Sequence, residues 1–278
     1  MSATRTFQLG HSPDPDDAFM FYPLLNGKVP CEGMKFTQIL EGIESLNRRA
    51  LKRELEVTAA SVHACALMGS TYKILDCGAS VGDGYGPIVV SRTPLALEDL
   101  HEHEVLIPGI LTTAYLALRL AAGRFRPKVT PFDQIPGEVL AGRAQAGLLI
   151  HEGQLTYAGM GLHKVVDLGA WWKEKRGLPL PLGVNVVRAD LGEKTIGEIQ
   201  AALKRSIEWA MAHRPEALGV AAEYGRGIDA ATTDRFVSMY VNEWTLSLGA
   251  KGRDAIGSLI REGREAGVIP EGEGPEFA

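Results

Sequence analysis

The sequence predicts an α/β protein with two lobes, in which the second lobe is inserted into the first and a ligand cleft lies between them. The chain has 278 residues, of which 45% are hydrophobic, so it can bury two cores of medium size. Strand-like and helix-like segments alternate twice, before and after Pro94. An extended run at residues 182–187 then returns the chain to a series of helices. We therefore expect residues 1–93 and 184–278 to form the first lobe and residues 94–183 the second.

The opening stretch, residues 9–22, predicts a strand, a sharp polar turn and a buried helix. Asp14 is a suitable N-cap because Pro15 follows it at the first helical position. Asp16 and Asp17 fall in the first turn, where the helix dipole favours acidic side chains. Capping accounts for Asp14 and Asp16, whereas Asp17 can face either the cleft or solvent. Such a turn lies at the carboxyl end of a strand, where α/β proteins bind ligands.

The remaining segments of the first lobe are identified by apolar periodicity and turn residues. We expect strands at residues 34–40, 56–60, 73–77 and 88–91, and helices at residues 43–51 and 64–68. Residues 78–87 are rich in glycine, but no Gly-Lys-Ser/Thr sequence follows them. This run is therefore expected to be a connector or a mobile lip of the pocket, and not a phosphate loop.

The second lobe and the C-terminal helices follow the same logic. We expect strands at residues 104–107, 129–132 and 146–150, and helices at residues 112–122 and 135–141. After the return, Thr195 and Glu198 predict a capping box, Pro215 begins a further helix, and Thr232 or Thr233 caps the next. A last helix is expected at residues 251–266, and the acidic residues 271–278 are expected to be frayed.

Composition argues against several classes of function. A formal net charge of −5 without a basic run argues against a nucleic-acid partner. No segment has the roughly 18 uninterrupted apolar residues of a membrane helix, and the first ten residues lack a signal-peptide pattern. We therefore expect a cytoplasmic protein with no membrane partner. Cys31, Cys65 and Cys77 have neither disulfide nor zinc spacing, and no dinucleotide fingerprint is present, so no metal or other cofactor is expected.

Four polar residues follow four separate predicted strands and are expected to face one cleft: Ser12, Ser61, Thr113 and His151. His151 follows the buried run at residues 147–150, and a histidine, with an ordinary pKa of about 6.5, can act as a base near neutrality. A hydrogen-bonded structural histidine is the alternative. The helix starts at Ser61 and Thr113 can each bind one end of a small acidic ligand, although simple N-capping is equally compatible with them.

Four segments resemble the 1,4-dihydroxy-6-naphthoate synthase family. They are Ser-Pro-Asp-Pro-Asp-Asp-Ala-Phe-Met-Phe at residues 12–21, Leu-Thr-Thr-Ala at 111–114, Ile-His-Glu-Gly-Gln at 150–154 and Leu-Pro-Leu-Gly-Val-Asn at 180–185. The resemblance covers nearly the whole chain. It implies a periplasmic-binding-protein type II fold without export, and a lyase of menaquinone biosynthesis that converts cyclic dehypoxanthinyl futalosine to 1,4-dihydroxy-6-naphthoate.

The resemblance also implies roles for individual residues. His151 matches the general base of the family, and two substrate-contacting turns are matched by Ala59, Ala60, Ser61, Thr113 and Ala114. Ser12 and Asp17, from the opening turn, are added to this expected substrate-binding set. Asn185 lies where the chain returns between the lobes, so it can contact the sugar-derived end of the substrate or serve as a hydrogen-bonding residue of a turn or hinge.

Two other functions fit the same expectations. A chorismate dehydratase shares the fold and the pathway, although the opening motif fits that family poorly. A non-catalytic cytoplasmic protein that binds small anions would need the cleft but no base. The partner expected from all of these alternatives is a small-molecule carboxylate, and the oligomeric state is left open.

Overall fold

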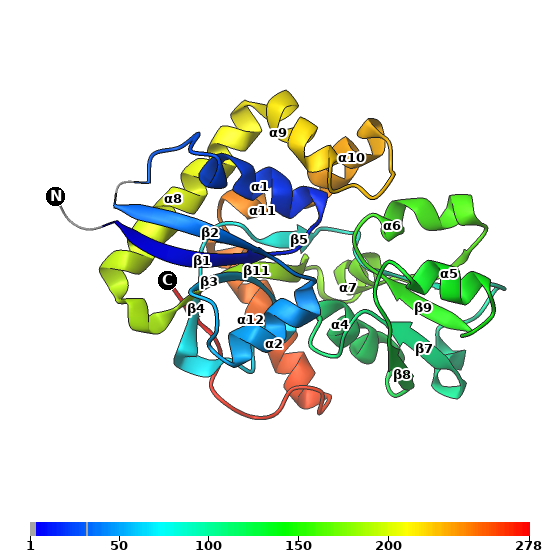
Figure 1. Cartoon of the computed structure of the whole chain (residues 1–278). Coiled ribbons are helices and arrows are strands. Elements are labelled where there is room, and N and C mark those ends of the chain that lie inside the picture. Colours follow the sequence, from blue (N-terminus) through cyan, green and yellow to red (C-terminus); the bar gives the residue numbers. More distant parts are fainter. Residues whose placement is uncertain (1–3, 32) are drawn as a thin grey trace.

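The computed structural model describes residues 4–31 and 33–278 and contains two β-sheets, one in each lobe (Figure 1). The sheet of the first lobe has the strand order β12-β4-β11-β3-β1-β2, and β5 pairs with β11 beside this path. Its strands are β1 (Arg5–His11), β2 (Met34–Leu40), β3 (Val57–Ser61), β4 (Tyr72–Ile74), β5 (Ser80–Gly82), β11 (Leu180–Arg188) and β12 (Glu276–Phe277). β1 is parallel to β2 and β3, whereas β11 is antiparallel to β3, so the returning chain lies beside the strand that ends at Ser61.

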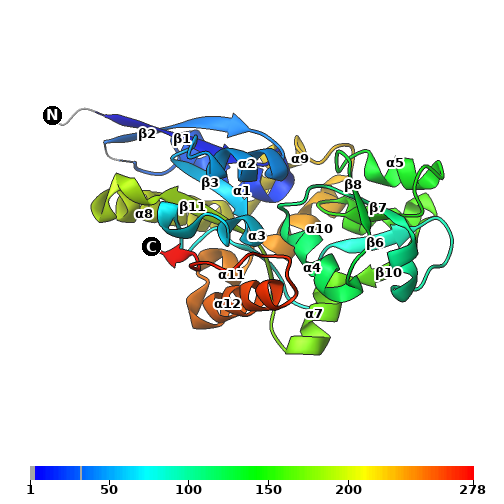
Figure 2. The same ribbon diagram turned by 90° about the horizontal axis from the view of Figure 1, so that it is seen from below.

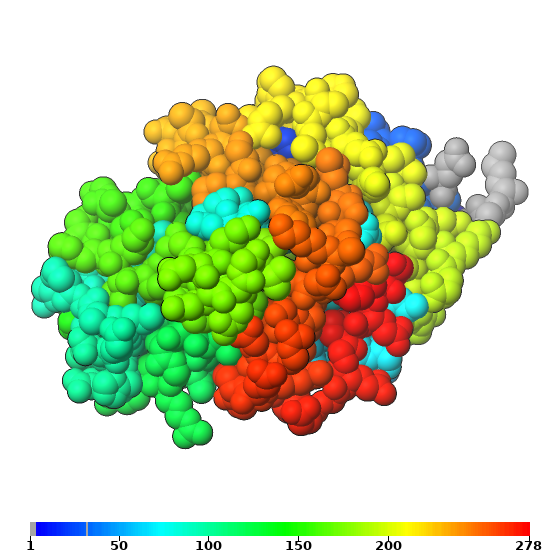
Figure 3. Space-filling model, turned by 180° about the vertical axis from the view of Figure 1, so that it is seen from behind, coloured from blue at the N-terminus to red at the C-terminus, as the bar shows by residue number. Residues whose placement is uncertain are grey.

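The sheet of the second lobe has the order β10-β6-β9-β7-β8. Its strands are β6 (Ile88–Ser91), β7 (Glu104–Ile107), β8 (Arg126–Val129), β9 (Ala146–Leu149) and β10 (His163–Asp167). The helices that accompany it are α4 (Thr113–Ala122), α5 (Ile135–Leu140), α6 (Gly153–Thr156) and α7 (Leu168–Arg176). On the back of the molecule α7 lies beside α12, where Arg176 and Glu262 form an ion pair of 2.5 Å (Figure 3).

The first lobe carries the other helices, seen from below in Figure 2. They are α1 (Pro15–Leu25), α2 (Ile43–Leu51), α3 (Val62–Cys65), α8 (Glu193–Ala212), α9 (Arg214–Ala222), α10 (Ala230–Tyr240), α11 (Glu243–Leu246) and α12 (Gly249–Glu265). Short 3₁₀ turns occur at Gly69–Thr71, Glu98–Glu102, Tyr157–Met160 and Ala189–Leu191. One buried cluster contains Leu116 of α4, Trp172 of α7 and Ile256 of α12, so the apolar core is continuous between the lobes. Among the described residues no helix is long and apolar enough to cross a membrane.

The helix α1 is buried against α8 and α9 and contains a proline. Pro23 lacks an N–H and opens the helical ladder. The Ser206 hydroxyl of α8 enters this opening: it donates to the Met20 carbonyl at 2.7 Å and accepts from the Leu24 N–H at 3.0 Å. The C-terminal half of α1 is thereby fixed to α8, so its N-terminal turn has a rigid support.

Several expected elements are confirmed and others are displaced. The strands at residues 34–40 and 104–107 and the helix at residues 43–51 have the expected bounds. The strand Ile88–Ser91 pairs with β9 and β10 of the second sheet, although the expected boundary at residue 93 assigned it to the first lobe. An apolar strand pattern does not reveal which sheet the strand joins. On the pairing we propose residues 83–179 for the inserted lobe.

Some local predictions were wrong for identifiable reasons. Thr195 does not cap α8, which begins at Glu193; its hydroxyl accepts hydrogen bonds from Arg5 instead. Asp229, and not a threonine, caps α10. The C-terminal residues are not frayed throughout, because β12 pairs with β4.

The glycine-rich run contains a strand that was not expected, and two further segments differ in their bounds. The run at residues 78–87 contains β5, which joins the first sheet through β11. The strand expected at residues 129–132 is β8, which ends at Val129. The helix expected at residues 64–68 is the short α3, which ends at Cys65.

Candidate functional site

A pocket with about 700 Å³ of empty space, part of it open to solvent, is lined by residues of both lobes. The first lobe contributes the β1–α1 turn, the end of β3 and part of β11. The second lobe contributes the start of α4 and the turn between β9 and α6. The segments that line the pocket are therefore mainly strand ends and helix beginnings, as the alternation of strands and helices predicts.

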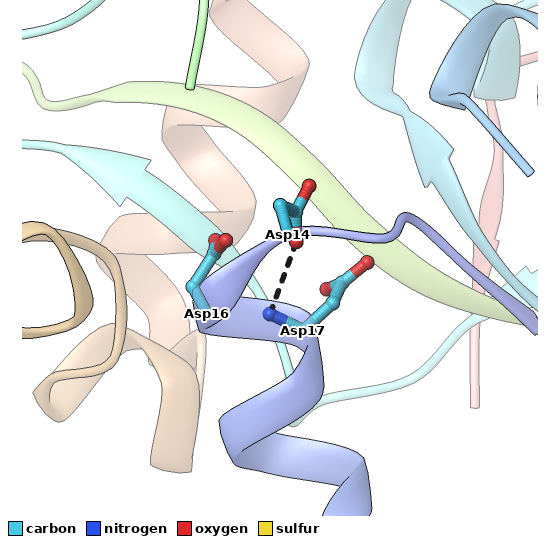
Figure 4. A group of neighbouring side chains, drawn as sticks. All are labelled: Asp14, Asp16 and Asp17. Atoms are coloured by element: carbon cyan, nitrogen blue, oxygen red, sulfur yellow. Dashed lines mark hydrogen bonds between the residues drawn. The ribbon is translucent and has the colours of Figure 1, made fainter. Parts of the chain in front are cut away.

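The N-terminal turn of α1 brings three carboxylates into the pocket wall (Figure 4). One oxygen from each lies within 4.8 Å of the others, and all three side chains are buried. Asp14 is the N-cap and accepts from the Asp17 N–H at 3.3 Å, while Asp17 accepts from the Ser12 N–H at 2.8 Å. Asp16 accepts from the Ser80 hydroxyl at 3.2 Å. Asp14 is therefore the cap and Asp16 lies in the first turn, as expected, although Asp16 also accepts from Ser80; Asp17 is buried and lines the pocket.

Burial and mutual repulsion raise the pKa of each of these carboxyl groups. Burial, and then the Asp17 charge, raise the pKa of Asp14 to about 8. Burial is also the first cause for Asp16 and Asp17, whose pKa values are raised well above the usual range, with Asp14 and Asp16 respectively as the charged neighbours. The group therefore retains protons near neutral pH. Among the described residues it is the one group of acidic, histidine or cysteine side chains close enough to hold a metal ion.

His151, on the second lobe, contacts one of these acids. Its Nδ1 atom is 3.1 Å from the Asp14 Oδ2 atom, and its side chain is 15% exposed. The residue has a φ of +54°, and its ring meets Phe132 edge-on with centroids 4.7 Å apart. Burial lowers the pKa of His151, while the Asp16 and Glu152 charges oppose this effect. A neutral imidazole at a pocket wall can accept a proton from a bound molecule.

The opposite wall is uncharged and rests on Asn47 of α2. The Asn47 amide oxygen accepts from the Ser61 N–H at 2.8 Å, and its nitrogen donates to the Ser61 hydroxyl at 3.0 Å. Asn47 is fully buried, and sequence reasoning missed it. Only the apolar residues around it in the predicted helix indicated that Asn47 would be buried. A buried polar side chain needs a hydrogen-bond partner, so this position could have been identified as one that makes a specific contact.

The start of α4 completes this uncharged wall. Thr112 is the N-cap and accepts from the Tyr115 N–H at 3.2 Å, and the first turn contains no acidic residue. The Thr113 hydroxyl donates to the Leu182 carbonyl at 2.6 Å and accepts from the His63 N–H at 3.2 Å. The hydroxyl of Thr113 is therefore used within the protein. The backbone N–H groups of Thr113 and Ala114 have no acceptor within the helix and point along its axis, which favours an anion.

The pocket brings together eight of the nine expected site residues: Ser12, Asp17, Ala59, Ala60, Ser61, Thr113, Ala114 and His151. Asn185 is the exception among the described residues. Its amide nitrogen donates to the Gly78 carbonyl at 2.8 Å, and a Cβ atom at Gly78 would lie 2.2 Å from that nitrogen. This arrangement corresponds to the hydrogen-bonding alternative, and Asn185 is not among the residues that line the pocket.

Two contacts near His151 join the lobes. Arg226, between α9 and α10, donates to both Glu152 carboxylate oxygens at 3.0 and 3.1 Å and also to the Pro13 carbonyl. Tyr240 donates to the Gln154 amide oxygen at 2.6 Å. Neither Arg226 nor Tyr240 was selected from the sequence, because both lie far along the chain from the motifs whose residues they contact.

Two α/β lobes, the second inserted into the first and both lining one pocket, define a fold of the periplasmic-binding-protein class. A Candida albicans protein described as having the generic periplasmic-binding-protein fold shares this architecture, with a TM-score of 0.70, 11% identity, and coverage of 97% of this chain and 92% of that one. A crystal structure of an Archaeoglobus fulgidus protein is much more similar: TM-score 0.91, 44% identity, 95% of this chain and 98% of that one.

Sequence comparison identifies the family. Residues 7–265 match the family described as menaquinone biosynthesis, and the chain belongs to it. A 1,4-dihydroxy-6-naphthoate synthase from Thermus thermophilus is 41% identical, over 98% of this chain and 99% of that protein. A protein of the same name from Streptomyces coelicolor is 34% identical, over 95% of both chains.

Proposed function

We propose that this protein is a 1,4-dihydroxy-6-naphthoate synthase, a carbon–carbon lyase that converts cyclic dehypoxanthinyl futalosine to 1,4-dihydroxy-6-naphthoate. The observation that carries the proposal is the presence of His151 and of the acid-free start of α4 in one pocket, in a chain that aligns over nearly its full length with two proteins of that name. The partner of the site is accordingly a small-molecule carboxylate, and we propose a cytoplasmic location.

The substrate carboxylate binds at the start of α4. The N–H groups of Thr113 and Ala114 donate to it, and the Ser61 hydroxyl, oriented by Asn47, adds a further polar contact. Ala59 and Ala60 leave room for the carbocycle, since their small side chains line the pocket floor. Ser12 and Asp17 line the acidic side, where the Asp17 carboxyl group already accepts from the Ser12 N–H, so this N–H is not available to a carboxylate. The carboxylate end of the substrate is therefore oriented toward α4.

His151 then removes a proton from the carbocycle. Carbon–carbon cleavage releases the sugar-derived fragment, and formation of the aromatic ring supplies driving force. This reaction needs a base, an anchored carboxylate and a pocket that excludes most water.

Turnover of the purified protein tests this function. Incubation with cyclic dehypoxanthinyl futalosine is expected to yield 1,4-dihydroxy-6-naphthoate, whereas chorismate is expected to remain unchanged. Conversion of chorismate to 3-enolpyruvylbenzoate would identify a dehydratase instead. Binding of the cyclic compound without product would identify a non-catalytic binding protein.

The His151→Asn variant tests the base. We expect kcat to fall by about 10³-fold or more, while the Kd for the cyclic compound changes by less than about threefold, because the carboxylate contacts lie on the other wall. His101→Asn is the matched control, since His101 is an exposed histidine outside the pocket. Full activity of His151→Asn would refute the role of His151.

A further inference from the structure

The contact between Asp14 and His151 joins residues of different lobes. Asp14 is fixed on the first lobe by its role as the cap of α1, and its side chain is 4% exposed. His151 follows β9 on the second lobe. Each Asp14 oxygen has a separate partner: Oδ1 accepts from the Asp17 N–H, and Oδ2 faces the His151 Nδ1 atom. The carboxyl group therefore cannot rotate without losing its cap.

The imidazole is held in this orientation from other sides as well. His151 adopts the left-handed region, which costs a residue other than glycine about 1 kcal/mol or more. Phe132 packs against the ring, and the Arg226 guanidinium lies 4.6 Å from the centroid of Phe132. Arg226 also binds Glu152, the residue after His151. In the described structure the His151 Nε2 atom has no hydrogen-bond partner, so it is the nitrogen available to a ligand.

The charge of the Asp14 oxygen 3.1 Å from Nδ1 influences which ring nitrogen carries the proton and which can act as a base. A carboxylate close to Nδ1 favours a proton on that nitrogen, and the lone pair of the neutral ring then lies on Nε2. A donor in the same position would place the proton on Nε2 and remove that lone pair.

We propose that Asp14 is the positioning residue of His151: from the first lobe it selects the Nδ1–H tautomer of an imidazole that the second lobe carries. This inference rests on the proposed role of His151. Capping alone does not account for the second Asp14 oxygen, which is directed at the ring and not at the backbone of α1.

The groups around this pair set its pH dependence. Asp16 and Asp17 of α1, Glu152 next to His151, and Arg226 from the α9–α10 connection face it. Tyr240 of α10 stays protonated because burial raises its pKa. Because the pKa of Asp14 is about 8, the carboxylate that accepts from Nδ1 forms as the pH rises through that value. We expect kcat/KM of the free enzyme to rise over the same interval.

Asp14→Asn and Asp14→Ser separate positioning from capping, because asparagine and serine are both good N-caps. In Asp14→Asn the cap retains the amide oxygen, so the NH₂ group faces Nδ1 and donates to it. We expect kcat to fall by about 10²–10⁴-fold with KM changed by less than about threefold. Asp14→Ser leaves Nδ1 without a carboxylate; we expect a loss of about tenfold and a pH profile without the rise near 8. Activities of both variants within about twofold of the parent would show that Asp14 is only a cap.

A second measurement does not depend on turnover. In protein labelled with ¹⁵N-histidine at pH 9, with the His151 signals assigned through His151→Asn, we expect the Nδ1–H tautomer in the parent protein and the Nε2–H tautomer in Asp14→Asn. The same tautomer in both proteins would overturn the proposal, whether or not the cyclic compound is converted. Failure of the parent protein to convert this compound, with the tautomer shift intact, would overturn the proposed function alone.

Discussion

Two helices, α1 and α4, begin at the same pocket but differ in the acidic residues of their first turns. The N-cap of α1 is Asp14 and its first turn contains Asp16 and Asp17, so three carboxyl groups lie at the positive end of its dipole. The first turn of α4 has a threonine cap and no acid, so its N–H groups and dipole remain available to a ligand. Two helix beginnings with extended N-cap residues thus give one wall with its own acidic side chains and one that is free of them.

This difference gives the pocket a direction. A substrate with one carboxylate is anchored at α4, and its other end is brought toward His151 and the acids of α1. The buried acids are costly, because each must be desolvated beside the others. These groups are expected to lower the free energy of unfolding, as is common for residues that form an oriented and reactive site.

The largest effect is expected when α4 is made to resemble α1. Ala114→Asp would place a carboxylate in the first turn of α4, where the dipole stabilises it but where it occupies the proposed anion site. We expect the Kd of the substrate to rise by about 100-fold or more, because like charges at close range in a buried pocket cost several kcal/mol. Titration calorimetry measures this change. Ala114→Asn, with the same shape and no charge, is the control, and an equal loss in both variants would contradict an anion site at α4.

An intermediate effect is expected from weakening the uncharged wall. Asn47→Ala removes both hydrogen bonds to Ser61 and leaves a cavity, so we expect a loss of about 1–3 kcal/mol in the free energy of unfolding. We also expect kcat/KM to fall about tenfold, mainly through KM, since Ser61 loses its orientation. Denaturant titration and steady-state kinetics measure the two effects. Unchanged KM would show that Ser61 makes no contact with substrate.

The contrast between the two helix beginnings was visible in the sequence, but the contacts between them were not. The motif at residues 12–17 predicts a capped acidic turn, and residues 112–114 predict a capped neutral one, because capping depends only on neighbouring residues. The contact between Asp14 and His151 depends on how the two sheets are placed relative to each other. The strands that precede these two residues are far apart in the chain. Local patterns do not contain that information.

The case of Asn185 depends on a contact between distant segments. Asn185 pairs with Ala59, which lines the pocket, so the alternation of side chains along the strand does not by itself turn Asn185 away from it. Val184 lines the pocket, whereas Asn185 turns to Gly78. The sequence does not show this contact, because the two segments lie far apart in the chain.

The smallest effect is expected from removing one of the three buried carboxyl groups at the start of α1. Asp16 carries a buried oxygen, Oδ1, without a partner among the described residues, and burial followed by the Asp14 charge raises its pKa well above the usual range. In the unfolded chain an aspartate ionises near pH 3.9. Above that pH the native state binds more protons than the unfolded state, so the free energy of unfolding falls as the pH rises toward the native pKa. Asp16→Asn removes this loss.

We expect Asp16→Asn to raise the free energy of unfolding by about 1–2 kcal/mol at pH 8, or the Tm by ~2–6 °C, with no gain near pH 3.5. His11 gives the opposite dependence in both proteins, because burial lowers its pKa to about 4 and stability is lost as the pH falls below about 6.5. Calorimetry across this pH range separates the two contributions. A gain of equal size at pH 3.5 and pH 8 would show that Asp16 affects stability through packing and not through its charge, and the two helix beginnings would then differ in shape alone.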